Sequence, residues 1–234
     1  MLACVRPVLI RQHVETAPAG TLIGWLDARG LAYEIDRSWL GAPLPDPEAY
    51  AFVVSLGHDR GANDTDLPAV AAERELLARA VARDVPVLGL CYGGQVLAAV
   101  LGARVGPAPV PELGWREIRT DDPQLVPPGP WLEWHFDRFT TPPGATEIAR
   151  TPEASQAFTL GPHLGVQFHP EATVDIVADW ASADAERLAA LGIEDGAALL
   201  ISSHERRSAA RAAAFQLFDA FLARADQSDQ RLAS

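Results

Sequence analysis

One cysteine stands between an apolar run and a glycine-rich turn near the middle of the chain. Residues 85–90, Val-Pro-Val-Leu-Gly-Leu, predict a buried strand, and residues 96–101 predict a helix. Cys91 lies at this junction, and the glycines that follow it permit a sharp turn that lifts the sulfur clear of a sheet. The positive end of the helix favours a thiolate there. Cys91 is therefore a candidate nucleophile, although an isolated free cysteine is equally well interpreted as a small buried hydrophobe.

A second motif, Val-Gln-Phe-His-Pro-Glu, lies far downstream at residues 166–171. Residues 165–168 predict a short strand, which Pro170 ends. His169 and Glu171 are two residues apart, so in an extended segment they project to the same side. A carboxylate beside an imidazole fixes its tautomer and stabilises the imidazolium. Taken alone the pair is an incidental ion pair at a strand end; together with Cys91 it predicts a nucleophile, a base and an orienting carboxylate.

The two motifs together resemble the class I glutamine amidotransferase family. Gly-x-Cys-x-Gly-x-Gln followed by Phe-His-Pro-Glu matches the Cys-His-Glu triad of its glutaminase domain. The resemblance covers nearly the whole chain and is strongest to single-domain members similar to the glutaminase domain of GMP synthase. It extends to Glu-Leu-Gly-Trp at 112–115, Trp-His-Phe-Asp-Arg-Phe at 134–139, Pro-Pro-Gly-Ala at 142–145, and the alanine-rich run at 209–215.

The predicted oxyanion hole combines two backbone amides. The elbow geometry supplies the amide of Tyr92, which follows the nucleophile. The resemblance implies a second donor in the loop after the third strand, where Gly57 is the best candidate. The family usually has Gly-Gly-Pro in this loop, so Leu56 and His58 are departures that put the oxyanion hole in question. His58 is also a candidate for substrate contact.

The resemblance also implies which residues bind the amino-acid end of the substrate. In the family the glutamine of the cysteine motif has this role, and it corresponds to Gln95. Backbone groups near His135 and Phe136 are expected to line the same pocket. The His135-x-Asp137 pair could form half of a metal site, but without a third ligand at suitable spacing we interpret it as a structural hydrogen bond. No metal and no cofactor are predicted.

Strands alternating with helices predict an α/β fold, a doubly wound and mostly parallel sheet with helices on both faces. The resemblance makes it flavodoxin-like, as in class I glutamine amidotransferases. Strands are expected at 5–10, 31–35 and 51–54, and helices at 21–29, ending at Gly30, and at 71–84. Residues 106–145 are expected to form irregular short strands over one edge of the sheet. We expect residues 1–234 to form a single domain with a helical C-terminal extension at about 174–225, made of helices at 174–191, 197–201 and 205–225.

Composition excludes several classes of protein. The formal charge of −12 and the lack of a basic stripe argue against nucleic-acid binding. No apolar stretch is long enough for a membrane span, and the start of the chain lacks a secretory signal. Two cysteines give no disulfide framework, and a thiol nucleophile needs a reducing setting, so a cytoplasmic location is expected. The Ser-Gly-Gly-x-Asp-Ser type of nucleotide-binding motif is absent, so an ATP-dependent partner reaction would occur on a separate synthetase.

These observations predict an enzyme that hydrolyses the side-chain amide of glutamine through a thioester on Cys91 and releases ammonia for a separate synthetase. The first alternative is a stand-alone hydrolase of γ-glutamyl peptides or conjugates with the same fold. The second is a non-catalytic regulatory relative, for which the only support is the pair Leu56 and His58.

Overall fold

The computed structural model describes residues 6–192 and 196–232 and is built around an eight-stranded sheet. The strand order is β2-β1-β3-β4-β10-β9-β8-β6. The first five strands in this order are parallel, and the last three continue the sheet with antiparallel pairing. The strands are β1 (Val8–Gln12), β2 (Tyr33–Arg37), β3 (Val53–Ser55), β4 (Val87–Leu90), β6 (Arg119–Thr120), β8 (Thr146–Arg150), β9 (Ser155–Leu160) and β10 (His163–Val166).

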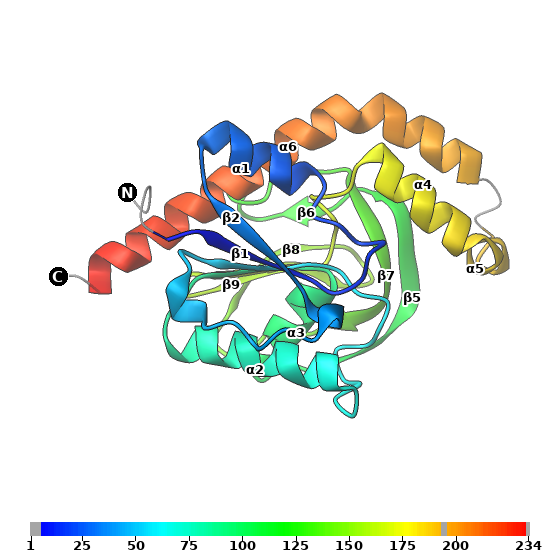
Figure 1. Cartoon of the computed structure of the whole chain (residues 1–234). Coiled ribbons are helices and arrows are strands. Elements are labelled where there is room, and N and C mark those ends of the chain that lie inside the picture. Colours follow the sequence, from blue (N-terminus) through cyan, green and yellow to red (C-terminus); the bar gives the residue numbers. More distant parts are fainter. Residues whose placement is uncertain (1–5, 193–195, 233–234) are drawn as a thin grey trace.

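Helices cover both faces of this sheet, as predicted (Figure 1). Helices α1 (Thr21–Arg29) and α6 (Gly196–Leu232) pack on one face, where Trp25 and Phe218 meet with ring centroids 5.4 Å apart. Helices α2 (Pro68–Ala82) and α3 (Tyr92–Val100) cover the other face around a second core that includes Leu76 and Val96. Two short 3₁₀ helices, η1 (Ser38–Leu40) and η2 (Pro47–Ala49), lie between β2 and β3. The doubly wound α/β fold is confirmed.

Most boundaries near the amino terminus are close to those predicted. The helix at 21–29 is confirmed, and Gly30 ends it with a φ of 64°, which glycine adopts readily. The first strand begins at Val8, and residues 1–5 lie outside the described residues. The second and third strands are each shifted by about two residues, and α2 begins three residues earlier than expected because Pro68 is well placed in a first helical turn.

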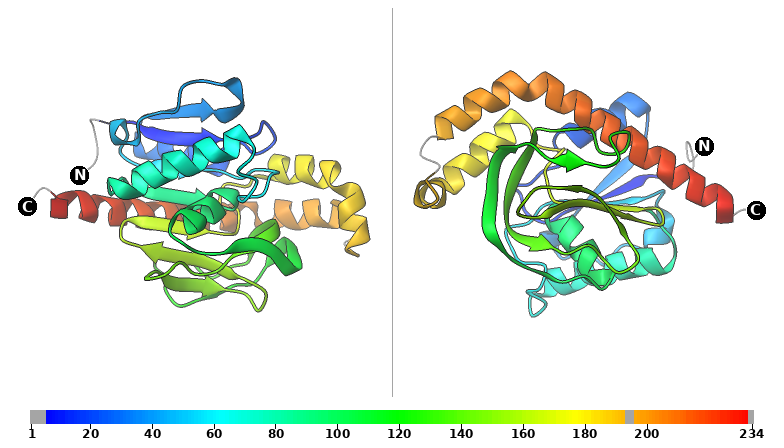
Figure 2. Two further views of the ribbon diagram at one scale, coloured as in Figure 1. Left: turned by 90° about the horizontal axis from the view of Figure 1, so that it is seen from below. Right: turned by 180° about the vertical axis from the view of Figure 1, so that it is seen from behind.

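Residues 106–145 are expected to form irregular short strands over one edge of the sheet, and the structure differs in part: the short strand β6 does lie at that edge, but most of the segment does not. Strands β5 (Val105–Arg116) and β7 (Trp131–Phe139) form a long two-stranded antiparallel ribbon outside the main sheet. A bulge between Pro107 and Glu112 absorbs the proline-rich part of β5, where prolines cannot donate ladder hydrogen bonds. In Figure 2 the ribbon curves along one side of the molecule, and β7 contacts α3.

The C-terminal helices also differ from the prediction. The helix expected at 174–191 is divided into α4 (Val174–Ala183) and α5 (Ala185–Ala190), which meet at Asp184. The helices expected at 197–201 and 205–225 are one continuous helix, α6, which runs along the molecule in Figure 1. Within the described ranges, no helix combines the length and the hydropathy needed to cross a bilayer.

The register of two neighbouring strands determines where the two motifs meet. Strands β4 and β10 are parallel, with Gly89 opposite Gly165 and Leu90 opposite Val166. Both strands end at this level, so Cys91 and the segment from Gln167 onward leave the sheet side by side at its carboxyl edge. Binding sites of open parallel sheets form at such an edge.

Candidate active site

Cys91 occupies a strained turn between β4 and α3. Its φ of 51° and ψ of −107° are unusual for a residue with a side chain, and it is the N-cap residue of α3. The Cys91 amide donates to the Val166 carbonyl at 2.9 Å, which ties the turn to the end of β10. The side chain is almost buried, with 6% of its residue surface exposed. The sequence prediction of an elbow is therefore matched by the backbone geometry.

The glycines around Cys91 are required by close backbone contacts. A Cβ atom on Gly93 would lie 2.1 Å from the Ser55 carbonyl oxygen, and one on Gly94 would lie 2.4 Å from that of Val166. We expect Gly93→Ala to lower the free energy of unfolding by about 3 kcal/mol or more, because backbone atoms must move to relieve the overlap. Urea unfolding measures this, with Gly106→Ala as the control, since a Cβ there meets nothing within 4 Å. Equal stability of the two variants would contradict the close approach.

His169 and Glu171 form a buried pair. His169 Nδ1 lies 2.7 Å from Glu171 Oε1, and both residues are at most 5% exposed. The backbone holds them in place, since the Thr21 amide donates to the Glu171 carbonyl at 2.8 Å and the His169 amide donates to Leu132 at 2.9 Å. Within the described part of the chain, Nε2 of His169 has no hydrogen-bond partner, so it is available to a group in the adjoining pocket.

The electrostatic surroundings favour a charged imidazole at this position. Burial acts to lower the pKa of His169, but the charges of Cys91 and Glu171 outweigh it and raise the pKa well above its usual value. The ring of Trp180 covers one side of His169, with centroids 4.6 Å apart and planes at 64°. This arrangement suits an imidazole that exchanges a proton with the sulfur.

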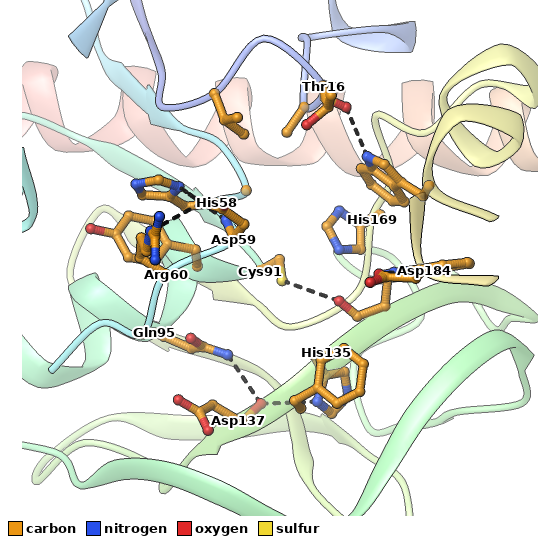
Figure 3. Close-up of a pocket in the computed structure, with 18 of the residues that line it drawn as sticks. Thr16, His58, Asp59, Arg60, Cys91, Gln95, His135, Asp137, His169 and Asp184 are labelled. Atoms are coloured by element: carbon orange, nitrogen blue, oxygen red, sulfur yellow. Dashed lines mark hydrogen bonds and ion pairs between the residues drawn. The ribbon is translucent and has the colours of Figure 1, made fainter. Parts of the chain in front are cut away.

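A pocket of about 730 Å³ opens above Cys91. Figure 3 shows the Cys91 sulfur near its centre, with His58 and Arg60 on one side, His169 and Asp184 on the other, and Gln95 below. The structure brings all the predicted site residues except Glu171 to its wall: Gly57, Cys91, Tyr92, Gln95, His135, Phe136 and His169. Glu171 lies behind His169, as expected of an orienting carboxylate.

A second glutamine, which the sequence analysis missed, joins the cysteine to Gln95. The Gln167 amide nitrogen lies 3.7 Å from the Cys91 sulfur, and its oxygen accepts from Gln95 at 3.3 Å. The Gln95 amide also donates to the Asp137 carbonyl at 3.0 Å. Spacing could have identified Gln167, because residues 167, 169 and 171 lie on one side of an extended segment.

Gly57 lies directly against the catalytic candidates. A Cβ atom on Gly57 would approach His169 Cε1 to 3.4 Å, so the loop after β3 reaches across to the histidine. Tyr92 is the first residue of α3, and its amide has no acceptor inside the helix. The two residues predicted to supply oxyanion donors therefore both border the space above the sulfur.

His135 lines the pocket but directs its ring into a buried cluster. Its Nδ1 contacts the Asp137 carbonyl at 2.9 Å, and its Nε2 lies 3.3 Å from carboxylate oxygens of both Glu112 and Glu133. The His-x-Asp pair is thus joined by a backbone hydrogen bond. Among the residues that the structure describes, no group of three or more His, Cys, Asp or Glu side chains is arranged to hold a metal ion.

We expect this cluster to make the free energy of unfolding decrease as the pH rises above neutrality. Burial acts to lower the pKa of His135, but Glu112 and Glu133 raise it to about 10, against 6.5 in an unfolded chain. The folded state therefore keeps a proton that the unfolded state releases, so this contribution is full below pH 6.5 and is lost as the pH approaches 10. From this one group, the free energy of unfolding falls by at most about 1.4 kcal/mol per pH unit.

Urea unfolding at pH 7, 8 and 9 tests this, because His135→Gln should reduce the decline in unfolding free energy. His163→Gln is the matched control, since burial lowers the pKa of His163 to about 4 and leaves that buried ring neutral throughout the range. An unchanged slope in His135→Gln would contradict the assignment.

The outer wall of the pocket was not predicted from the sequence. Trp180, Asp184 and Arg187 of the α4–α5 segment border it together with Trp134 of β7. Trp180 Nε1 donates to the Thr16 carbonyl and Trp134 Nε1 to Asp184, both at 2.8 Å. The Arg187 guanidinium lies 4.4 Å from the centre of the Phe136 ring. Local patterning indicated the helix but not which of its side chains face a distant ribbon.

Solved structures of glutamine amidotransferases have the same fold over nearly their whole length. One from Methylobacillus flagellatus superposes with a TM-score of 0.87 at 27% identity, covering 94% of this chain and 96% of that one. Another from Thermotoga maritima gives a TM-score of 0.85 at 27% identity, covering 93% and 98%.

Curated relatives match over a shorter segment. The GMP synthase [glutamine-hydrolyzing] of Aeropyrum pernix is 42% identical over 95 residues, which is 37% of this chain and 18% of that protein. One of the subunits of the GMP synthase [glutamine-hydrolyzing] of Ignicoccus hospitalis is 37% identical over 95 residues, or 37% of this chain and 50% of that protein. The matches thus span half or less of these relatives' lengths.

The matching family model, glutamine amidotransferase class-I, covers residues 60–176. These 117 residues are half of the 234-residue chain and include the cysteine elbow and the histidine–glutamate pair. The chain therefore belongs to the class I glutamine amidotransferase family.

Proposed function

We propose that this protein hydrolyses the side-chain amide of glutamine through a thioester on Cys91 and releases ammonia for a separate synthetase. One observation carries the proposal: Cys91, in a strained turn at the start of α3, shares a pocket with His169, whose Nδ1 is 2.7 Å from Glu171. Nucleophile, base and orienting group are thus available at one wall of a pocket large enough for a small-molecule substrate.

In the proposed first half-reaction, His169 Nε2 takes the thiol proton and the sulfur attacks the amide carbon. The tetrahedral oxyanion is stabilised by the amides of Tyr92 and Gly57. His169 then gives its proton to the leaving nitrogen, the C–N bond breaks, and ammonia and a glutamyl thioester result. Glu171 keeps His169 in the tautomer with Nε2 toward the sulfur and stabilises the imidazolium.

In the second half-reaction, water attacks the thioester with His169 as the base. The same oxyanion donors act again, the C–S bond breaks, and glutamate leaves while the sulfur recovers its proton. Gln95 and the backbone near His135 and Phe136 would bind the amino and carboxyl groups of the substrate.

A separate synthetase would use the ammonia. The relative from Ignicoccus hospitalis is by name one subunit of a glutamine-hydrolysing synthase, which supports a two-chain arrangement here. A reducing compartment such as the cytoplasm suits a thiol nucleophile.

The direct test is the purified chain with glutamine as its substrate. We expect glutamate and ammonia in equal amounts, measured by coupled assays, and no product from asparagine, whose shorter side chain cannot bring its amide to Cys91 while Gln95 holds the amino-acid end. Absence of turnover, alone and with candidate synthetases, would contradict the proposal and favour a regulatory relative.

One observation favours a second candidate, a stand-alone γ-glutamyl hydrolase. The pocket is also lined by Arg187 and by Trp180, whose ring lies 4.6 Å from that of His169, the residue that protonates the leaving group in the proposed mechanism. Its volume of about 730 Å³ is in the range of pockets for ligands larger than one amino acid. Comparing kcat/KM for glutamine and a γ-glutamyl dipeptide separates the two, since fast turnover of the dipeptide alone would favour the hydrolase.

A further inference from the structure

The ring of His58, which follows Gly57, packs against two other aromatic rings. His13, which follows β1, stacks on His58 with centroids 5.7 Å apart and planes at 18°. Tyr92 packs edge-on against both, 5.1 Å from each centroid. We infer that this His13–His58–Tyr92 cluster positions the Gly57 amide for oxyanion stabilisation, a role that rests on the proposed function. His13 and His58 are positioning residues in this account, since they act through Gly57.

The loop needs such a support because its backbone is fixed only on one side of Gly57. The Leu56 amide donates to Arg11 at 3.1 Å, and the Leu56 carbonyl accepts from Gly93 at 3.2 Å, so the start of the loop is joined to β1 and to the elbow. No hydrogen bond of the Gly57 or His58 backbone occurs within residues 6–192 and 196–232. Glycine is the most flexible residue, and here only the neighbouring side chains limit its peptide planes.

A buried polar chain holds the cluster in place. His13 Nε2 lies 3.2 Å from the Ser55 hydroxyl, which donates to Glu73 Oε1 at 2.7 Å. Glu73 Oε2 accepts from Arg11 Nε at 2.8 Å, and Arg11 also pairs with Asp36. Ser55 and Glu73 are fully buried, so each hydrogen bond is shielded from water and costly to break. These hydrogen bonds connect β2, β1, α2 and β3, in that order, to the ring of His13.

The charges of this region are consistent with a stacked pair of histidines. Burial lowers the pKa of His13 to about 4, despite the opposing effect of Glu73, and burial also lowers the pKa of His58. Both rings are therefore neutral near pH 7 and do not repel one another. His58 Nδ1 lies 2.9 Å from the Asp59 amide nitrogen and 2.8 Å from the Asp59 carboxylate, and these contacts fix the rotation of the outer ring.

A double-mutant cycle of His13→Ala and His58→Pro tests the inference. Proline fixes φ by itself, and the His58 amide donates to no group in the described chain, so His58→Pro removes no hydrogen bond of that amide, although it does remove the contacts of Nδ1 with Asp59. We expect His13→Ala to lower kcat for glutamine about 10- to 100-fold, with KM changed less than about threefold, because misplaced oxyanion donors affect the transition state. In the His58→Pro background, His13→Ala should lower kcat by less than about threefold.

Two further variants separate positioning from general loss of structure. His13→Phe keeps the ring but not the hydrogen bond to Ser55, so its loss of kcat should be smaller than that of His13→Ala. His163→Ala also removes a buried histidine, but at the opposite end of β10 from the site, and should leave kcat unchanged. Hydrogen exchange of the peptide that contains residues 56–59 should be faster in His13→Ala than in His163→Ala, a readout that needs no turnover.

The outcomes are distinct. A parent that releases no ammonia contradicts the proposed function, whereas the exchange experiment still decides whether the cluster orders the loop. A parent that turns over with kcat unchanged in His13→Ala, or with equal losses in both backgrounds, overturns the positioning role. Unchanged hydrogen exchange in His13→Ala overturns it as well.

Discussion

Cys91→Ala is expected to lower the rate of glutamine hydrolysis about 10⁴-fold or more, to the background of the assay. The sulfur is the attacking atom in the proposed mechanism, and among the described residues that line the pocket Cys91 is the one that can form a thioester. Ammonia release at saturating glutamine measures the loss. Cys4→Ala is the matched control, because it removes the only other cysteine of the chain and should retain full activity.

Two outcomes would contradict this assignment. Turnover by Cys91→Ala above about one part in 10³ of the parent would move the nucleophile elsewhere. Equal losses in both cysteine variants would indicate a general effect of thiol removal. Circular dichroism of Cys91→Ala must match the parent for either conclusion, since this residue has a φ of 51° that alanine also tolerates poorly.

Glu171→Gln is expected to lower kcat about 10²- to 10⁴-fold while KM changes little. Glutamine has nearly the same shape, but its amide cannot stabilise the imidazolium of His169 and can reverse its tautomer by presenting an NH₂ group. The pKa of His169 should also fall, because Glu171 is one of the two groups that raise it. Steady-state kinetics and NMR titration of the His169 ring measure the two effects.

Glu75→Gln on the exposed face of α2 is the control for a change of one negative charge. It should leave both kcat and the His169 titration unchanged. If Glu171→Gln changes only KM, Glu171 would be a binding residue, and its hydrogen bond to His169 would have no part in the chemistry.

The elbow could be predicted from the sequence because its determinants are local. An apolar strand, one cysteine and two glycines define a turn whose backbone contacts are too close for any other residue at Gly93. The proximity of Cys91 to His169 could not be predicted from local sequence, because it depends on β10 lying beside β4 with Val166 opposite Leu90. The resemblance to a known family indicated that Cys91 and His169 act together, whereas the periodicity of the sequence could not indicate it.

The break that was wrongly predicted within α6 is explained by tertiary contacts. The gap expected between the helices at 197–201 and 205–225 contains serines at 202 and 203, a residue type that can compete with the helix backbone for hydrogen bonds. In the structure Ser203 donates to Leu199 at 2.8 Å and accepts from Trp115 of β5 at 2.9 Å, so its hydroxyl is satisfied inside a continuous helix. The ribbon partner that makes this possible was itself unpredicted.

The outer wall of the pocket and the His13–His58–Tyr92 cluster illustrate a second limit of prediction from the sequence. His13, His58 and Tyr92 come from three segments, and nothing in their spacing indicates a stack. The sequence identified Leu56 and His58 as departures from the family pattern, but the ring contacts of His58 became visible only in three dimensions.

Covalent labelling by 6-diazo-5-oxonorleucine, a reactive glutamine analogue, tests the central claim most directly. It needs both recognition of glutamine and an attacking sulfur, so it reports on the pocket and the nucleophile together. Peptide mass spectrometry of the labelled protein should find one adduct per chain, on Cys91, which excess glutamine suppresses and Cys91→Ser abolishes. An adduct that persists in Cys91→Ser, or one that maps to Cys4, would contradict the account.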